Sequence, residues 1–271
     1  MAKHKRVWNQ AIHEKYVREG RGSGCGPDYK PWIRVQDFAS RGVVSRVKGR
    51  TTGRVHHLMS NNELAYFYIL DWSENVTDIR EQYPLSDLES AIGIAAQAGV
   101  RYPKDNTSGY PYIMTCDFMI STTSGPKART IKMSSELSNK RVLEKLEIER
   151  RYWSKLSVDW KIVTENEILF RKAKNVEWLY SARELHMTNT LQDAAAELLQ
   201  IINTTRISVS ESAELIESYY YLKPGAGLQL FKYLVLNGFL KIDLNEPINL
   251  NAKGLVEANE QSVCKYASKN Y

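Results

Sequence analysis

The sequence predicts an α/β fold in which a mixed sheet flanked by helices is followed by a mainly helical domain. Its 271 residues exceed the usual size of one hydrophobic core, which favours two domains. Strand-like and helical patterns alternate up to about residue 165, whereas helical patterns dominate after about residue 169. We therefore expect two domains, residues 1–168 and 169–271.

The composition is that of an ordinary globular protein, with 43% hydrophobic and 25% charged residues. No run of eighteen apolar residues is present, and the charged amino terminus is not followed by the apolar stretch of a signal peptide. Three cysteines are too few for a disulfide framework. These features predict a soluble, cytoplasmic protein with no membrane partner.

Positive charge is concentrated near the amino terminus. Residues 1–59 contain thirteen Lys and Arg against four Asp and Glu, a net charge of +9, whereas the rest of the chain sums to −3. Such a segment, interleaved with aromatic residues, is typical of surfaces that follow nucleic-acid phosphates; an ordinary solvated surface is the alternative. The candidate DNA-binding side chains are Arg41, Arg46, Lys48, Arg50, Arg54 and His56.

The first elements are expected to alternate between helices and strands. Ser60-Asn61-Asn62-Glu63 has the form of a capping box, which marks the start of a helix. Pro84 ends a strand-like stretch, and Gly99 closes the helical pattern that follows it. The expected elements are a helix over 7–19, a glycine-rich loop over 20–32, a hairpin or exposed loop over 41–54, a helix over 60–74, a strand over 76–83 and a helix over 88–98.

Two neighbouring strands, 112–120 and 129–133, are predicted on either side of the turn-prone residues 121–126. Side chains alternate between the two faces of a strand. Asp117 therefore points away from the apolar residues that precede and follow it, and Lys132 points away from its apolar neighbours in the second strand. An acid and a lysine are thus expected on the same face of adjacent strands.

Residues 134–156 have the most regular helical pattern in the chain, and a strand is expected over 159–163. Glu149 falls on the apolar side of that helix. Burial of a carboxylate without a partner is costly, so Glu149 joins the candidate catalytic residues. A salt bridge to Lys132 or to an arginine is the structural alternative.

The carboxy-terminal domain is expected to contain helices and one hairpin. Three helices followed by a hairpin suggest a winged-helix module, whose third helix would read a DNA groove. That helix contains only Lys232 as a cation, so protein docking stays open as the alternative. The expected elements are helices over 171–184, 189–203, 209–221 and 225–237, and a hairpin that joins 239–243 to 248–250.

The polar residues on these elements suit phosphodiester cleavage. Magnesium binds oxygen ligands and can activate water while offsetting phosphate charge, so Glu63 and Asp117 fit as ligands. Lys132 would stabilise the developing negative charge. Each residue also has a structural interpretation: Glu63 as part of the capping box, Asp117 as a strand-edge acid and Lys132 as a surface lysine.

A glutamate on an early helix, an aspartate on a strand and a lysine on the next strand resemble the PD-(D/E)xK arrangement of type II restriction enzymes. The surrounding sequence is more specific. From about residue 17 to Ser181 it resembles the TnsA family, the endonuclease subunits of heteromeric cut-and-paste transposases. The stretches that carry the resemblance are EGRG (19–22), DYKPW (28–32), TGRVHHL (52–58), DIREQYPL (78–85), TCDF (115–118) and LEKLEIERRYW (143–153).

The resemblance implies a restriction-endonuclease-like fold and a nuclease that cuts the 5′ strands at transposon ends. A TnsB-like transposase would cut and join the 3′ strands, and a TnsC-like ATPase would regulate both. Glu63 and Asp117 would bind Mg²⁺, with two ions expected, and Lys132 would be the catalytic lysine. Thr130 replaces the acid or glutamine usual in the family, so either its hydroxyl or the Ile131 carbonyl would complete the site, and Mn²⁺ could replace Mg²⁺. The enzyme would act at the prokaryotic nucleoid.

Two other functions stay open at this point. One is a free-standing nuclease of the restriction or repair type, which would cleave DNA without partner proteins. The other is a DNA-binding assembly factor whose nuclease site has weakened through the change at Thr130.

Overall fold

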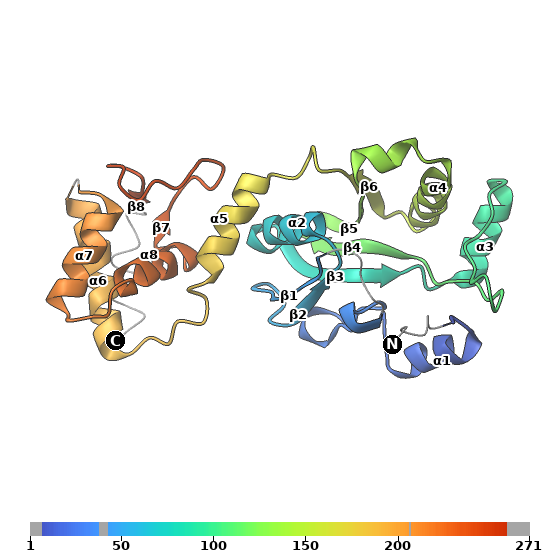
Figure 1. Cartoon of the computed structure of the whole chain (residues 1–271), viewed down its shortest axis with the longest axis horizontal. Helices are drawn as coiled ribbons and strands as arrows, with labels where there is room; N and C mark the ends of the chain where they lie inside the picture. The colour runs from blue at the N-terminus through green and yellow to red at the C-terminus, as the bar shows by residue number, and fades with distance from the viewer. Residues whose placement is uncertain (1–6, 38–42, 206, 259–271) are drawn as a thin grey trace, which may run out of the picture. The chain divides into compact units, whose positions relative to one another are not determined.

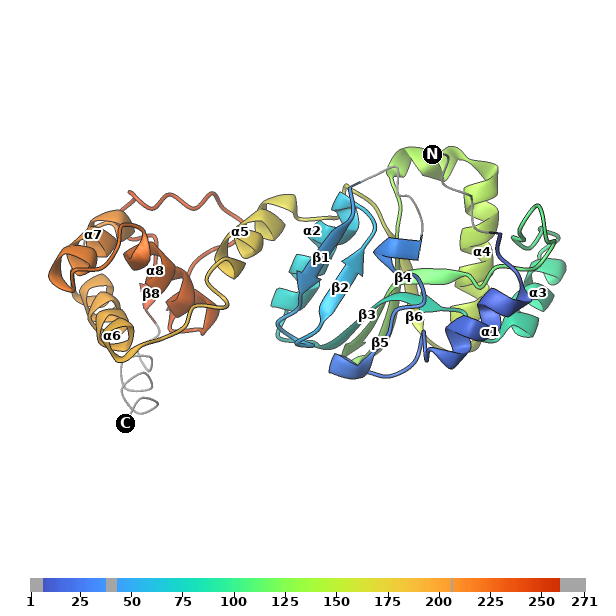
Figure 2. The ribbon, with the colours of Figure 1, turned by 60° about the horizontal axis from the view of Figure 1, so that its bottom comes forward.

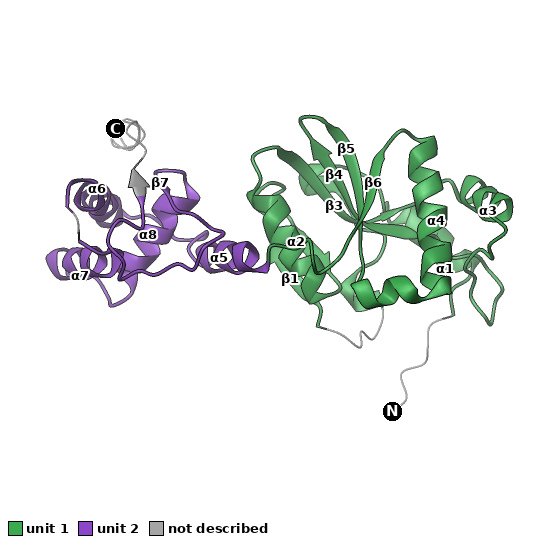
Figure 3. Cartoon of the chain, turned by 90° about the horizontal axis from the view of Figure 1, so that it is seen from above, with its two compact units in different colours: residues 1–169 green, residues 170–271 purple. Residues whose placement is uncertain are grey.

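The computed structural model describes residues 7–37, 43–205 and 207–258. The chain divides into two compact units, Met1–Leu169 and Phe170–Tyr271 (Figure 3). This division lies one residue beyond the boundary expected from the sequence. No helix among the described residues is long and apolar enough to cross a membrane.

A four-stranded mixed sheet forms the centre of the first unit (Figure 1). In spatial order its strands are β3 (Val76–Pro84), β4 (Thr115–Thr122), β5 (Gly125–Ile131) and β6 (Asp159–Val163). Strand β4 runs antiparallel to its neighbours β3 and β5, whereas β6 runs parallel to β5. A parallel pair needs a long crossover, which the helix α4 (Lys140–Lys155) supplies. The predicted mixed sheet flanked by helices is therefore confirmed.

Helices pack on both faces of this sheet. Phe118 of β4 contacts Tyr66 of helix α2 (Asn61–Trp72), with ring centroids 5.9 Å apart. The next residue, Met119, points to the other face and belongs to a core cluster with Trp153 of α4 and Ala91 of helix α3 (Leu88–Gln97). Asp117 therefore lies in a strand that is covered on both sides.

The predicted boundaries of two central elements were wrong. The strand expected over 129–133 is Gly125–Ile131. It starts earlier than expected because Thr122 pairs with Gly125, which leaves only residues 123–124 in the turn. The helix expected from residue 134 begins at Lys140, because the Asn139 side chain caps it by accepting two backbone N–H groups. Residues 134–138 form a 3₁₀ helix instead.

The amino-terminal segment contains a short helix and a hairpin. Helix α1 (Gln10–Arg18) lies within the helix predicted over 7–19. A hairpin is formed by β1 (Ser45–Lys48) and β2 (Val55–Leu58), and its second strand lies beyond the range 41–54 in which a hairpin or exposed loop was expected. The hairpin lies beside α2 (Figure 2). Single 3₁₀ turns occur at Gly26–Asp28 and Val35–Asp37.

Ser60 caps the first turn of α2, as predicted, but the Glu63 carboxylate bonds to Met59 N–H and the Ser60 hydroxyl, which is not the pairing of a capping box. Ser60 Oγ accepts a hydrogen bond from the Glu63 backbone N–H at 3.1 Å and donates to the Glu63 carboxylate at 3.0 Å. The Met59 N–H also donates to that carboxylate, at 2.9 Å. These bonds fix the Glu63 side chain at the first turn of the helix.

The second unit is mainly helical. Its buried core includes Leu198, Ile216, Leu230 and Phe231. The helices are α5 (Phe170–Tyr180), α6 (Asn189–Thr204), α7 (Val209–Tyr219) and α8 (Ala226–Leu236).

The hairpin predicted for this unit was wrong. The two-residue strand β7 (Leu240–Lys241) pairs with β8 (Glu257–Ala258) rather than with residues 248–250. The Leu250 carbonyl instead accepts a hydrogen bond from the Ser210 N–H of α7 at 3.0 Å. Lys232, the cation on the expected groove-reading helix, is buried and donates to Ser181 Oγ at 2.8 Å. The side chain of Lys232 is thus held inside the unit.

Candidate active site

Four of the expected site residues lie close together although they come from different elements. Asp117 is in β4, Lys132 follows the end of β5, Glu63 lies in the first turn of α2 and Glu149 lies in α4. Lys132 Nζ is 3.9 Å from Asp117 Oδ2, and Gln82 Nε2 lies within hydrogen-bond distance of both Glu63 and Asp117. The structure thus brings three carboxylates and a lysine to one region of the sheet.

Asp117 is held where β4 and β5 begin to separate. Phe118 pairs with Arg129, whereas the Ile131 N–H donates to Asp117 Oδ2 at 2.6 Å. That bond fixes one carboxylate oxygen against the second strand. The other oxygen, Oδ1, faces the amide of Gln82 at 3.3 Å.

Lys132 carries the positive charge of the site. Its Nζ donates to the Ile131 carbonyl at 2.9 Å. Burial alone would lower the pKa of Lys132, but the nearby carboxylates, Asp117 foremost and then Glu149, raise the pKa above its ordinary value. The ammonium group is therefore protonated at neutral pH.

Glu63 is buried and close to a second negative charge. Burial and the charge of Asp117 raise the pKa of Glu63 to about 8. Hydrogen bonds from Met59 and Ser60 oppose this shift. At neutral pH the metal-free site therefore favours the protonated form of Glu63, and a nearby cation would favour its ionised form.

Glu149 is also buried, and its partner differs from the expected one. Instead of the salt bridge that was considered, Glu149 Oε2 accepts a hydrogen bond from Thr130 Oγ1 at 2.6 Å. Burial raises the pKa of Glu149 to about 7, the Thr130 bond opposes the shift, and the Asp117 charge adds to it. The carboxyl group thus titrates near neutral pH.

The hydroxyl of Thr130 has two partners. It donates to Glu149 and accepts from Trp160 Nε1 at 3.2 Å, and the residue is 1% exposed. The expected interaction of this hydroxyl with a metal ion would have to compete with both bonds. The observed contacts indicate instead that Thr130 holds the Glu149 side chain in place.

Gln82 was missed in the sequence. Its amide nitrogen lies 3.4 Å from Glu63 Oε2 and 3.3 Å from Asp117 Oδ1, and the residue is buried. A glutamine inside a strand-like stretch carries no signal of such a role. Its backbone φ of 49° is unusual for a residue other than glycine and could not be read from the sequence.

The expected DNA-binding residues fall into two groups. Arg46, Lys48 and Arg50 lie on the β1–β2 hairpin or directly after β1 and are exposed. The expectation for Arg54 and His56 was wrong, because both side chains are buried and donate to the carboxylate of Glu81. The sixth candidate, Arg41, lies outside the described residues.

The buried Glu81 explains why Arg54 and His56 point inward. Burial opposes ionisation of this carboxyl, but hydrogen bonds from Arg54 and His56 outweigh it and lower the pKa of Glu81 to about 2. The His57 N–H donates to the same group at 3.0 Å. Glu81 of β3 therefore attaches the β2 end of the hairpin to the sheet.

The acids suit a magnesium ion by their chemistry. Magnesium keeps several waters and is usually bound by one or two carboxylates, which Glu63 and Asp117 supply together with the Ile131 carbonyl beside them. A cation there would offset the repulsion that contributes to the raised pKa of Glu63. Within the described part of the chain, no three His, Cys, Asp or Glu side chains form a complete metal-binding cluster.

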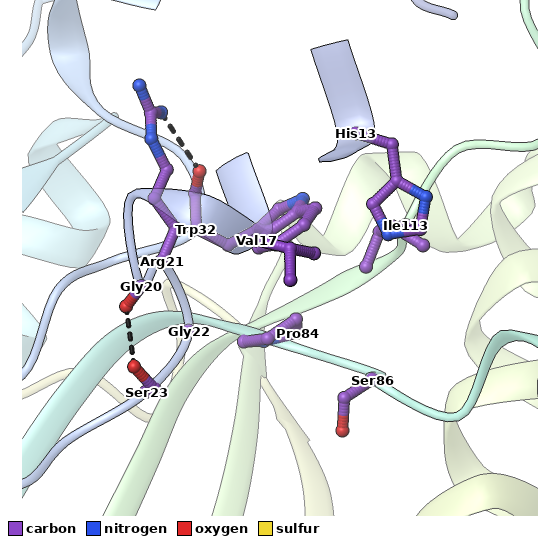
Figure 4. A pocket seen from close by; sticks show the side chains of 10 residues that line it. All are labelled: His13, Val17, Gly20, Arg21, Gly22, Ser23, Trp32, Pro84, Ser86 and Ile113. Atoms are coloured by element: carbon purple, nitrogen blue, oxygen red, sulfur yellow. Dashed lines mark hydrogen bonds between the residues drawn. The ribbon is translucent and has the colours of Figure 1, made fainter. Parts of the chain in front are cut away.

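A pocket of about 270 Å³ lies apart from these acids, between α1, the glycine-rich loop and the end of β3 (Figure 4). None of the expected site residues lines it. Gly22 there has a φ of 76° and packs so closely on Pro84 that a Cβ would not fit. The lining residues are His13, Val17, Gly20, Arg21, Gly22, Ser23, Trp32, Pro84, Ser86 and Ile113.

Comparisons with known proteins match both units. Residues 73–165 match the family described as "TnsA-like endonuclease N terminal", and residues 167–244 match that described as "TnsA endonuclease C terminal". The chain is 34% identical over 255 residues to the Transposon Tn7 transposition protein TnsA of Escherichia coli. That match covers 93% of this chain and 92% of the relative.

Proposed function

The chain belongs to the TnsA family of endonucleases that act in transposition, and from this we propose that it cleaves the 5′ strands at transposon ends with a magnesium-dependent site. The observation that supports this site most is the meeting of Glu63, Asp117 and Lys132 from three separate elements. Their arrangement is of the PD-(D/E)xK type, in a restriction-endonuclease-like sheet.

The proposed roles follow from charge and position. A bound divalent cation would lower the pKa of a water molecule and offset the charge of the phosphate. Glu63, Asp117 and the Ile131 carbonyl would hold the ion. Lys132, protonated and 3.9 Å from Asp117, would stabilise negative charge that develops on the phosphate oxygens.

Glu149 would be the third carboxylate of the site. Its pKa near neutral suits a group that takes a proton from water, and Thr130 would orient it through the 2.6 Å hydrogen bond. With Asp117, Glu149 would also provide oxygen ligands for a second Mg²⁺. Mn²⁺ accepts the same oxygen ligands and would support the reaction as well.

We assign DNA contact first to the basic hairpin. Arg46, Lys48 and Arg50 are exposed and would follow the phosphate backbone. The second unit, of a winged-helix-like type in this proposal, would bind DNA or a partner protein. A TnsB-like transposase would cut and join the 3′ strands, a TnsC-like ATPase would regulate both enzymes, and the complex would work on DNA in the bacterial cytoplasm.

Plasmid nicking tests the proposed function. Supercoiled DNA carrying transposon ends is incubated with Mg²⁺ or Mn²⁺, with and without the TnsB-like and TnsC-like proteins. We expect double-strand breaks by the wild type only with metal and partners. With Asp117→Ala, only the 3′-strand nicks of the TnsB-like protein should remain. The variant Glu89→Ala, which removes an exposed acid from α3, should cleave like the wild type.

The engaged hydroxyl of Thr130 favours a second candidate function, a DNA-binding assembly factor with a weakened nuclease site. In that case wild type and Asp117→Ala would support assembly on DNA equally, and the 5′ strands would stay uncut with both. Cleavage by the wild type without any partner protein would instead indicate a free-standing nuclease.

A further inference from the structure

Gln82 lies between the two carboxylates proposed to bind metal. Its amide nitrogen is 3.4 Å from Glu63 Oε2 and 3.3 Å from Asp117 Oδ1. An amide NH₂ group has two hydrogens, so it can donate to both acids at once. The residue is 5% exposed, which leaves little water to take over these bonds.

The orientation of this amide is fixed from the other side. Thr115 Oγ1, on the neighbouring strand β4, donates to Gln82 Oε1 at 3.2 Å. A hydroxyl donor at Oε1 leaves the NH₂ end to face the acids, and ionised acids can only accept. The hydrogen-bond pattern therefore gives Gln82 the part of a donor to Glu63 and Asp117.

The backbone adopts a costly conformation to place this side chain. Gln82 has a φ of 49°, in the left-handed region that residues with a Cβ rarely adopt. The residues on either side, Glu81 and Tyr83, keep their pairing with β4, so the irregularity is confined to one position. The Gln82 carbonyl accepts a hydrogen bond from the N–H of Trp32, a residue that lines the pocket of Figure 4, at 3.3 Å.

We propose that Gln82 is a positioning residue that holds the Glu63 and Asp117 carboxylates together, in the arrangement that a divalent cation requires, before the cation binds. The proposal rests on the metal site of the proposed function. A cation requires both carboxylates in the ionised form, in which they repel each other, and the free energy of holding them together is subtracted from the free energy of metal binding. The neutral amide lowers that cost by donating to both. Groups that orient metal ligands in this way commonly change metal affinity 10- to 100-fold, roughly, when removed.

Binding of Mn²⁺ to the full-length protein without DNA tests the proposal, with the affinity measured by electron paramagnetic resonance. Gln82→Met keeps the length of the side chain but removes the amide. Gln82→Gly removes the side chain and also the penalty of the positive φ. We expect both variants to bind Mn²⁺ about tenfold or more weakly than the wild type. Thr115→Val, which frees the amide to rotate, should show a smaller loss.

Two further comparisons distinguish the effect of backbone strain on Mn²⁺ affinity from the effect of the Gln82 amide. Ser157 also has a positive φ, 56°, and is exposed, so Ser157→Gly relieves strain away from the acids and should leave Mn²⁺ affinity unchanged. Gln82→Asn keeps an amide and tolerates positive φ, and should bind Mn²⁺ more tightly than Gln82→Gly. Metal-free thermal unfolding checks that each variant is folded.

The outcomes distinguish the role of Gln82 from the proposed metal site itself. Equal Mn²⁺ affinity of Gln82→Met, Gln82→Gly and the wild type would overturn the role of Gln82. Wild-type affinity in Gln82→Gly with a loss only in Gln82→Met would also overturn it, because a residue without any side-chain amide would then be sufficient for metal binding. Equal affinity of the wild type and Asp117→Ala would instead contradict the metal site of the proposed function. If Gln82→Met does not fold, the Gly and Asn variants decide.

Discussion

At the scale of single residues, the site is a set of acids whose charges are balanced only in part. Lys132 supplies one positive charge against Glu63, Asp117 and Glu149. Burial and mutual repulsion raise the pKa values of Glu63 to about 8 and of Glu149 to about 7. This is the electrostatic state expected of a site that binds cations.

The raised pKa of Glu63 predicts a pH-dependent stability. Its folded-state pKa of about 8 lies above the ordinary value of 4.5, so the folded protein holds a proton that the unfolded chain releases. The free energy of unfolding of metal-free protein should therefore fall as pH rises from 4.5 to 8, by up to about 1.4 kcal/mol per pH unit from this group.

Urea unfolding in EDTA at several pH values measures this effect. Glu149 contributes in the same direction below its pKa of about 7, so the range between pH 7 and 8 reports mainly on Glu63. Glu63→Gln should lose the slope in that range, and added Mg²⁺ should reduce it in the wild type. An unchanged slope in Glu63→Gln would show that Glu63 is already ionised at neutral pH.

The positions of some of these residues could be predicted from the sequence, whereas the contacts of others could not. Strand alternation predicted that Asp117 and Lys132 share a face, and the structure places their charged groups 3.9 Å apart. The contact of Thr130 with Glu149 joins a strand to a helix, and Gln82 depends on a local backbone distortion. Neither has a periodic signal, so neither could be read from spacing.

At the scale of elements, Glu81 connects the β1–β2 hairpin to the sheet. The carboxylate is fully buried and accepts from Arg54 and His56 of the hairpin. Removal of one partner from a buried ion pair leaves an uncompensated charge and typically costs about 3–5 kcal/mol. Glu81→Gln should therefore lower the free energy of unfolding by roughly that amount.

Urea unfolding at neutral pH measures this loss. The matched control is Glu89→Gln, an exposed acid for which the expected change is within about 0.5 kcal/mol. A small effect of Glu81→Gln would mean that Arg54 and His56 find other partners, and the hairpin would then be held by its apolar contacts.

The β1–β2 hairpin carries two kinds of basic side chain, those expected to bind DNA and those that stabilise the fold. Arg50→Ala should weaken DNA binding and reduce the salt slope of log K by about one, since one phosphate contact is lost. Arg54→Ala should instead lower stability, because its guanidinium is bonded to Glu81. Fluorescence anisotropy with duplex DNA at several salt concentrations, combined with thermal unfolding, distinguishes the two. Equal effects of both variants on the salt slope would contradict this division.

Errors in predicted elements have identifiable causes. The α4 helix starts late because Asn139 caps it, and side-chain caps outweigh the propensity of the preceding residues. The hairpin of the second unit was placed on the nearest apolar segment, whereas β7 pairs with the more distant β8. Local patterns find such segments but do not choose between partners, because pairing is decided by tertiary packing.

At the scale of the whole molecule, the two units match two parts of one endonuclease family. The carboxylate site lies entirely within the first unit. Cleavage should thus depend on the first unit, and assembly with DNA or partner proteins on both.

Strand-resolved mapping of cleavage at a transposon end tests the central claim most directly. The full-length protein is combined with its TnsB-like and TnsC-like partners, Mg²⁺ and end-labelled transposon DNA, and breaks on each strand are located on a sequencing gel. We predict that Asp117→Ala abolishes the 5′-strand breaks while the 3′-strand breaks and joining continue. Persistence of the 5′-strand breaks in Asp117→Ala would contradict the assignment of the site.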